Sequence, residues 1–315
     1  MNGVTIASGF FVAVTPVAMA ACGAAMLARG FRAVRGTTLL APWLWSIGSL
    51  AIVAISETAI AVLHAAQTPA TAQLRLAAAA TTFCPLVALL GAKRPQDRAW
   101  QWIVLSFWVI LSLPTAEAWL MRPSEPPTVH PVWSWFLAVL VFFGCANYLP
   151  TRFWPAAILA AAGQIVLNWS YLPAPLPALP EIAPLMGLGM LVAALVAASV
   201  IGVRPLRGNE SLDRLWLDYR DRYGAVWGLR VAERINAAAK SYGWDVRLGW
   251  YGFTAGHGGL VTVVLPEQRA EIEKSLRTVL RRFVSAEWID RRLAVCNPHT
   301  SLPSDKTGIP TTSEA

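Results

Sequence analysis

The chain has 315 residues, of which 56% are hydrophobic and only 14% charged, and its formal net charge is +8. Soluble domains usually carry about 25% charged residues, so this composition excludes an ordinary soluble globular protein. The charges are unevenly placed: residues 1–203 hold nine Lys or Arg and five Asp or Glu, whereas residues 204–315 hold seventeen and thirteen. The first part has its basic residues in short loops and the second mixes both signs, so we expect no nucleic-acid partner.

Seven stretches of the first part are apolar enough to cross a lipid bilayer, for which a helix needs about 20 residues. They are residues 4–27, 39–66, 74–90, 102–121, 132–149, 154–172 and 184–203. Three arginines follow the first stretch and no basic residue precedes it, the reverse of a secretory signal. The sequence therefore predicts a membrane all-α fold of about seven transmembrane helices over residues 1–203, with Pro114 able to kink the fourth.

The orientation follows from the loops between these stretches, because loops on the cytoplasmic side are rich in Lys and Arg. An outside N-terminus leaves only Arg75 and Arg122 on the outer side. The cytoplasmic side then holds Arg29, Arg32, Arg35, Lys93, Arg94, Arg98 and Arg152. We expect a multi-pass protein of the bacterial cytoplasmic (inner) membrane, with its N-terminus outside and its C-terminus in the cytoplasm.

Five polar residues within or beside the spans are candidates for ligand binding, since ionisable residues at membrane depth are unfavourable and often functional. They are Glu57, Glu117, Gln164, Asn168 and His64. In one interpretation they line a single pocket that opens outward and takes a cation, a proton or a small polar ligand. In the other, each makes a hydrogen bond between helices and serves the structure. The sequence leaves both open.

A haem-handling role is a weaker alternative. His64 and His130 would both lie at the outer face, and Trp133 and Trp135 follow in HPVWSWF. Haem-handling membrane proteins of the cytochrome c maturation type are similar in this respect, but their longer tryptophan-rich signature ending in aspartate is absent. We expect no cofactor and no metal, because the cysteines have no metal-ligand spacing. These cysteines are Cys22, Cys84, Cys145 and Cys296.

The C-terminal part begins with a helical pattern over residues 209–241, in which large apolar residues recur at three- and four-residue steps. Its aromatic residues are candidates for binding a protein partner on the cytoplasmic side: Trp216, Tyr219, Tyr223 and Trp227. Such a helix either lies in the membrane interface or packs on the rest of its own domain. We favour packing, which needs only ordinary folding.

Two strand-like runs follow at residues 245–253 and 259–265, and the turn-rich linker TAGHGG between them predicts a hairpin. Proline begins a second predicted helix at residues 266–293. The region 204–296 is therefore predicted to be a small soluble α-β-β-α domain in the cytoplasm. Residues 297–315 are polar and are predicted to be a disordered tail.

Two segments, LWLDYRDRYGAVWGLRVAERINAAAKSYGWDVRLGWYGF at 215–253 and GAKRPQDRAWQWIVLS at 91–106, carry a resemblance. They resemble segments of uncharacterised bacterial multi-span membrane proteins with a cytoplasmic α/β tail. The resemblance covers about a fifth of the chain and implies the class alone, with no activity and no site residue.

Three function classes remain open. The first, which we favour, is a polytopic inner-membrane accessory, assembly or regulatory protein that acts through its cytoplasmic domain. The second is a transporter or a membrane protein that binds an ion or small ligand in the outward pocket around Glu57, Glu117 and Asn168. The third is a membrane-embedded enzyme or haem-handling protein. Motifs such as H-E-x-x-H and G-x-S-x-G are absent from the sequence, so we assign no catalytic residue.

Overall fold

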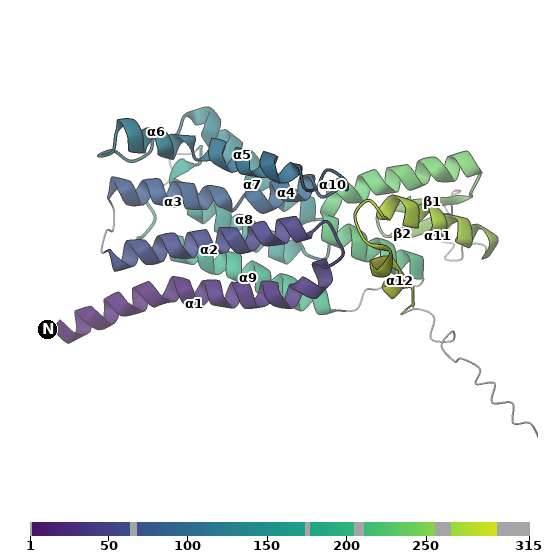
Figure 1. Ribbon diagram of the computed structural model, residues 1–315, viewed down its shortest axis with the longest axis horizontal. Coiled ribbons are helices and arrows are strands. Elements are labelled where there is room, and N and C mark those ends of the chain that lie inside the picture. Colours follow the sequence, from purple (N-terminus) through teal and green to yellow (C-terminus); the bar gives the residue numbers. More distant parts are fainter. Residues whose placement is uncertain (1, 64–67, 174–176, 205–210, 256–265, 295–315) are drawn as a thin grey trace, which may run out of the picture.

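The computed structural model describes residues 2–63, 68–173, 177–204, 211–255 and 266–294, with side chains from residue 14 onward except at 266 and 267. A long helical bundle carries a smaller domain at one end, which we call the domain end (Figure 1). The start of the first helix lies at the opposite end, which we call the far end. The predicted tail at 297–315 lies outside the described residues.

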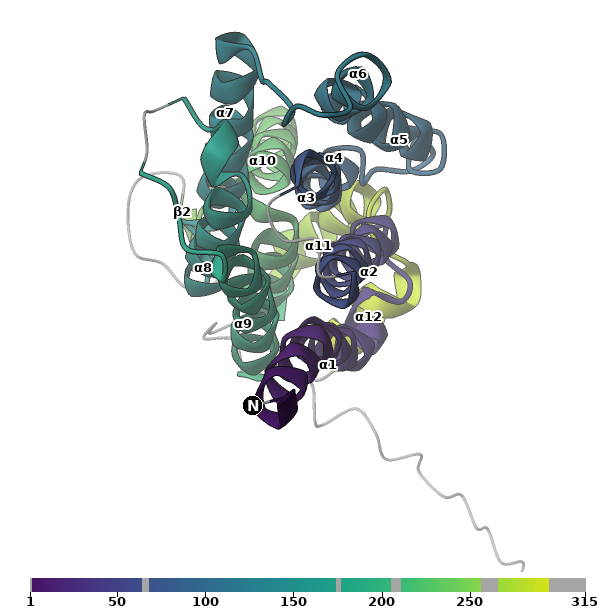
Figure 2. The ribbon, with the colours of Figure 1, turned by 90° about the vertical axis from the view of Figure 1, so that its left-hand side faces the viewer.

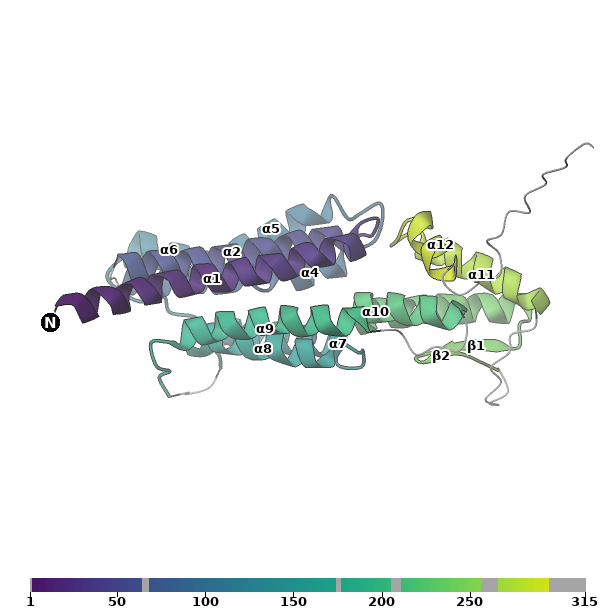
Figure 3. The same ribbon diagram turned by 90° about the horizontal axis from the view of Figure 1, so that it is seen from below.

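Two helical layers form the bundle, as the view from below shows (Figure 3). The first layer consists of α1 (Asn2–Val34), α2 (Leu40–Val62), α3 (Pro69–Thr81), α4 (Cys84–Leu90), α5 (Trp100–Leu111) and α6 (Leu113–Met121). The second consists of α7 (Pro131–Tyr148), α8 (Trp154–Leu167), the 3-10 turn η1 (Trp169–Tyr171) and α9 (Ala183–Val203). Seen from the far end, α8 and α9 face the first layer, and α1 lies beside α9 (Figure 2).

Five runs of helix in the described residues are long and apolar enough to cross a membrane. They are Val14–Val34, Leu40–Val62, Pro69–Leu90, Pro131–Tyr148 and Ala183–Val203. Helices α5 and α6 qualify together as a sixth, bent by 44°. Pro114 stands in the first turn of α6, and the kink predicted from it is confirmed, because proline offers no N–H to continue the helix.

The sixth predicted stretch is shorter as a helix than its apolar sequence. Helix α8 has 14 residues, which span only about 21 Å at 1.5 Å per residue. It ends at Leu167, and Asn168 leads into η1. The membrane all-α prediction is thus supported by several long apolar helices, while α8 alone does not reach the length of a full crossing.

The C-terminal domain consists of α10 (Ser211–Tyr242), β1 (Val246–Gly249), β2 (Gly252–Ala255), α11 (Pro266–Leu280) and α12 (Ala286–Ala294). The two strands pair antiparallel from Val246 with Ala255 to Gly249 with Gly252. The hairpin therefore turns at residues 250–251, inside the run that was predicted as one strand. Glycines on both sides of the turn favour it, and Gly252 has a φ of 134°. The predicted second strand at 259–265 lies outside the described residues.

The helix predicted over 266–293 is broken between α11 and α12. The loop between them uses its backbone to pair with the loop between α1 and α2. Thr38 N donates to Phe283 O at 2.9 Å, and Ser285 N donates to Gly36 O at 2.7 Å. In a continuous helix these backbone groups would bond within the helix and could not reach the bundle. The helix is therefore interrupted where it contacts the bundle.

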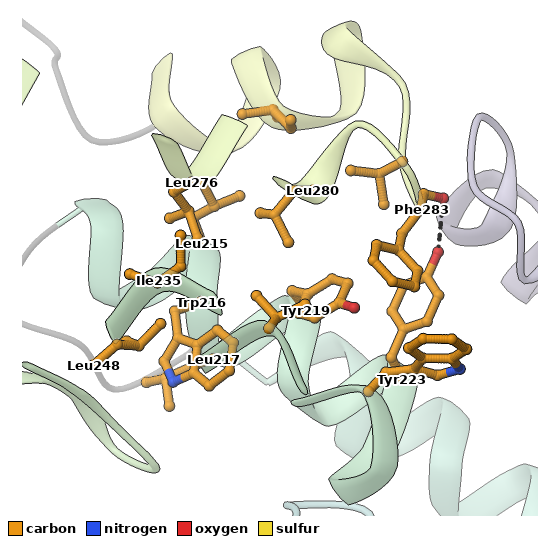
Figure 4. Packing of buried hydrophobic residues seen from close by; sticks show 14 of the residues in the cluster. Leu215, Trp216, Leu217, Tyr219, Tyr223, Ile235, Leu248, Leu276, Leu280 and Phe283 are labelled. Atoms are coloured by element: carbon orange, nitrogen blue, oxygen red, sulfur yellow. Dashed lines mark hydrogen bonds between the residues drawn. The ribbon is translucent and has the colours of Figure 1, made fainter. Parts of the chain in front are cut away.

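Apolar side chains from the C-terminal domain and from the bundle form one core. Trp216, Tyr219 and Tyr223 are fully buried in it. Figure 4 shows Tyr219 and Tyr223 beside Phe283, whose backbone oxygen accepts a hydrogen bond from Tyr223. Leu39 and Leu89, at the domain end of the bundle, belong to the same cluster. The domain is therefore packed onto the bundle as well as joined to it by the chain.

Helix α10 is broken at Gly224, whose φ of 76° and ψ of −172° lie in a region essentially restricted to glycine. The break leaves backbone groups without helical partners, and the end of α7 supplies them. Asn147 Oδ1 accepts from Val226 N at 3.0 Å, and Tyr148 Oη donates to Arg222 O at 3.0 Å. Two consecutive residues of α7 thus cap both halves of α10.

Replacing Gly224 by alanine should loosen the domain from the bundle. An added Cβ would lie 2.2 Å from Asn147 Nδ2, so Asn147 would have to move and release Val226 N. We expect a loss of at least about 3 kcal/mol from backbone strain and overpacking. The measurement is the temperature at which the C-terminal domain of the purified chain becomes sensitive to protease.

Gly243→Ala is the matched control, because Gly243 also has a positive φ, of 67°, but has nothing within 4 Å of its added Cβ. It should lower stability by only about 1–2 kcal/mol. Equal shifts for the two variants would contradict the close approach at Asn147.

Candidate functional site

The contact between the C-terminal domain and the domain end of the bundle, which we call the junction, is held by aromatic side chains. Trp227 Nε1 donates to Leu89 O at 2.9 Å, and Trp250 Nε1 donates to Pro150 O at 2.9 Å. Tyr223 Oη donates to Phe283 O at 2.8 Å. Burial raises the pKa of Tyr223, so its phenol keeps the proton that it donates. Trp227 and Trp250 therefore join the domain to α4 and to the α7–α8 loop, while Tyr223 joins α10 to the α11–α12 loop within the domain.

A cluster of charged side chains lies at the same junction. Asp218 Oδ1 accepts from Arg222 Nε at 2.9 Å and from Arg152 Nη2 at 3.3 Å, and its Oδ2 accepts from Arg292 Nε. Asp221 pairs with Arg152 at 3.4 Å and also with the neighbouring arginine of α10. We call the set of Arg152, Asp218, Arg220, Asp221, Arg222 and Arg292 the charged cluster.

The cluster is buried and carries more positive than negative groups. Burial alone would raise the pKa of Asp218, but the guanidinium groups of Arg222 and Arg292 outweigh burial and lower it, which keeps the carboxylate ionised. Burial lowers the pKa of Arg152, against the opposing pull of Asp218. Within the cluster, Asp218 is shared by three guanidinium groups and Asp221 by two.

A cavity of about 450 Å³ lies between the two layers, in the half of the bundle nearest the domain end. We call it the inner cavity. Its walls are mostly apolar, and Arg222 and Tyr148 line its domain end while Gln164 and Ser49 line its deep end. The apolar lining includes Leu27, Leu50, Leu86, Ala157, Ala160, Leu191 and Ala198.

Two further cavities lie toward the far end. One, of about 350 Å³, is lined by Arg75, Tyr171 and Glu181 among others. The other, of about 440 Å³, lies between α6 and the start of α7 and is lined by Glu117 and His130. Gln164 and Glu117 therefore line different cavities.

The two predicted glutamates lie in separate ion pairs. Glu57 is buried and accepts two hydrogen bonds from Arg75, at 2.9 Å from Nε and 2.8 Å from Nη2. Such bidentate pairing is the strong form of a carboxylate–guanidinium contact. Glu117 is exposed and accepts from Arg122 Nη2 at 2.9 Å.

The other predicted ligand residues make contacts of a structural kind. Gln164 Nε2 donates to Thr82 O at 2.9 Å, which joins α8 to the link between α3 and α4. Asn168 is fully buried, and its Nδ2 donates to Gln164 O at 2.8 Å. His130 caps α7 by accepting from Val132 N at 3.3 Å. His64 lies outside the described residues, and within those residues no group of three His, Cys, Asp or Glu could hold a metal.

The four aromatic candidates for partner binding are all buried. Trp216, Tyr219 and Tyr223 have no exposed surface, and Trp227 is 7% exposed. Helix α10 is surrounded by β1, β2, α11, α12 and α7, so these rings have no open side for a partner. The partner-binding role expected for them is therefore replaced by packing within the domain and against the bundle, the alternative favoured for the helix as a whole.

Sequence reasoning missed the residues that make the junction. Asn147 and Arg152 stand in a predicted span end and a short loop, with nothing local to show that α10 covers them. The signal in α10 was the segment LDYRDRY, where charged residues lie on both sides of the apolar stripe. Such a helix needs buried ionic partners wherever it is covered on all sides.

Comparison with known proteins gave no relative: no protein-family model matches the chain, and no curated protein and no solved structure is significantly similar to it.

Substituting the two glutamates should separate their roles. Glu57→Gln leaves the partly buried Arg75 without its carboxylate and should lower stability by about 1–3 kcal/mol. Glu117→Gln breaks an exposed pair and should change stability by less than about 1 kcal/mol. Thermal unfolding of the purified chain in detergent measures both. If the outward pocket of the sequence-based hypothesis operated, both variants would lose function together while remaining as stable as the parent chain.

Proposed function

We propose that this chain is a multi-pass protein of a bacterial cytoplasmic membrane that serves as an accessory, assembly or regulatory protein and acts through its C-terminal domain. In this proposal the bundle crosses the membrane seven times, the N-terminus is outside, and the domain is cytoplasmic. A protein partner on the cytoplasmic side would bind the outer surface of the domain, and the bilayer surrounds the bundle.

The arrangement of the helices supports seven crossings. Helices α5 and α6 form one bent crossing, and α8 with η1 forms a short one, beside the five long runs. An odd number of crossings suits a chain whose first helix begins at the far end and whose C-terminal domain lies at the domain end (Figure 1). Basic residues gather at the domain end, as cytoplasmic loops require: Arg29, Arg32, Arg35, Lys93, Arg94, Arg98, Arg152 and Arg204.

The single observation that carries the functional part is the docking of the domain. A domain that merely hung from α9 would need no contact with the bundle. Here α10 is broken at Gly224 so that α7 can cap it, and the charged cluster joins Arg152 of the bundle to Asp218 of the domain. The domain is thus held in one position relative to the bundle, an arrangement that would present its outer surface to a membrane-bound partner in a fixed orientation.

The proposed topology is tested with single cysteines in a chain whose native cysteines are replaced by alanine. Ser124 lies in the exposed loop between α6 and α7, and Gln96 lies in the loop between α4 and α5. A membrane-impermeant maleimide should label Ser124→Cys in intact cells and Gln96→Cys only after the membrane is opened. The reverse pattern would overturn the orientation, and labelling of both sites in intact cells would overturn the odd number of crossings between the loops.

The accessory role is tested by tagged purification from native membranes in mild detergent, followed by mass spectrometry. The full chain should retain a stoichiometric protein partner, and a chain ending at Val203 should lose it while still inserting into the membrane. A chain ending at Ala294 is the control, because it keeps α12 and should retain the partner. Equal recovery of the partner without the domain, or a full chain that retains none, would contradict the proposal.

A further inference from the structure

The inner cavity has the dimensions of a ligand site. Its volume of about 450 Å³ falls in the range of about 300–1,000 Å³ typical of small-molecule pockets, which are likewise mostly apolar with a few placed polar groups. Along α8 the lining runs from Ala157 to Gln164, which is about 10 Å of helix. The cavity is therefore an elongated apolar space that ends at the junction.

Arg222 gives the cavity a charged end. Its side chain lines the cavity and is only 17% exposed. Nε is engaged by Asp218 at 2.9 Å, while Nη1 and Nη2 make no hydrogen bond to any residue in the described part of the chain. A guanidinium group with unused donors beside an apolar space favours a carboxylate or phosphate, which accepts two of them at once.

The charged cluster around Arg222 also favours an anion. Its six side chains are all at least three-quarters buried. Asp218 is shared among Arg152, Arg222 and Arg292, so Arg222 engages only part of one carboxylate. An anion at the cavity end of Arg222 would give its guanidinium group a further partner.

The donor groups at the deep end of the cavity already have hydrogen-bond partners. Ser49 Oγ donates to Thr81 O at 2.6 Å, and Gln164 Nε2 donates to Thr82 O at 2.9 Å. Because both groups already donate to backbone carbonyls, this end suits the apolar part of a ligand. The two ends of the cavity therefore differ: the end at the junction suits an anion, and the end within the bundle suits an apolar group.

We propose that the inner cavity binds an anionic amphiphile of the bilayer, with its apolar chain between the two helical layers and its carboxylate or phosphate at Arg222. The inference rests on the membrane placement proposed above and not on the existence of a protein partner. The ligand would contact the charged cluster directly, since Arg222 belongs to both.

The test uses the purified full chain in mild detergent and a photoactivatable palmitic acid as the probe. Labelling should be saturable and should map by mass spectrometry to peptides of α8 and α9. The methyl ester of the same probe has no charge and should label about tenfold less, the loss expected for one charge-assisted hydrogen bond. Competition by unlabelled palmitate and by lysophosphatidic acid then separates a carboxylate from a phosphate preference.

Two kinds of variant locate the site. Ala160→Phe fills the cavity and should abolish labelling, whereas Ile158→Phe on the exposed side of the same helix should not change it. Arg222→Ala should weaken labelling about tenfold, and Arg222→Lys, which keeps the charge but not the two-donor geometry, should weaken it less. The elution profile of each variant establishes that it is folded, and Ala160→Phe leaves the charged cluster intact should Arg222→Ala misfold.

Three results would overturn the inference: equal labelling by the acid and its ester, labelling that Ala160→Phe leaves unchanged, or labelling confined to outward-facing residues of the bundle. Loss of a protein partner in the purification experiment would have no bearing on these results. The two proposals therefore fail separately.

Discussion

The architecture depends on one close approach, between the backbone of Gly224 and the side chain of Asn147. Only a residue without a Cβ fits there, and only a residue free to adopt a φ of 76° with an extended ψ can make the turn. The break lies where α10 meets the bundle, and both halves of the helix pack in the C-terminal domain: Trp216 donates to Gly249 O, and Asn236 donates to Leu248 O. Asn147 and Tyr148 bond the backbone groups that the break leaves without helical partners. The bundle therefore supplies hydrogen bonds that α10 cannot make within itself.

The charged cluster lies beside this break because the break brings it there. Asp218 and Arg222 are one helical turn apart on α10, and docking carries both against Arg152 of the bundle and Arg292 of α12. Ionic groups covered in this way are stable only when each one has partners. Asp218 pairs with both Arg152 and Arg292, and the cluster therefore ties the position of α12 to that of the bundle.

The inner cavity connects this region to the interior of the bundle. Tyr148 and Arg222 belong to its lining and to the junction at once. A ligand in the cavity would thus touch the residues that hold the domain in place. Two functional classes suggested by the sequence would then use adjoining parts of one structure. They are a regulator acting through its domain and a membrane protein that binds a small ligand. The proposed ligand site lies at the domain end, away from Glu57, whose carboxylate accepts two hydrogen bonds from Arg75.

Composition and hydrophobic length alone predicted the long apolar helices of this protein. Long apolar runs predict helices wherever they occur, because a backbone in an apolar environment must satisfy its own hydrogen bonds, and α1, α2, α7 and α9 follow those runs. The apolar stripe of α10 and the kink at Pro114 were local signals of the same kind. The tertiary structure decided the break at Gly224, the turn at residues 250–251 and the separation of α11 from α12. It also placed Glu57 and Glu117 in different ion pairs, buried the aromatic residues of α10, and formed the charged cluster and the inner cavity. The physical reason is that each of these features joins residues far apart in the chain, and neither the spacing of residues nor their local propensity records which surfaces will meet.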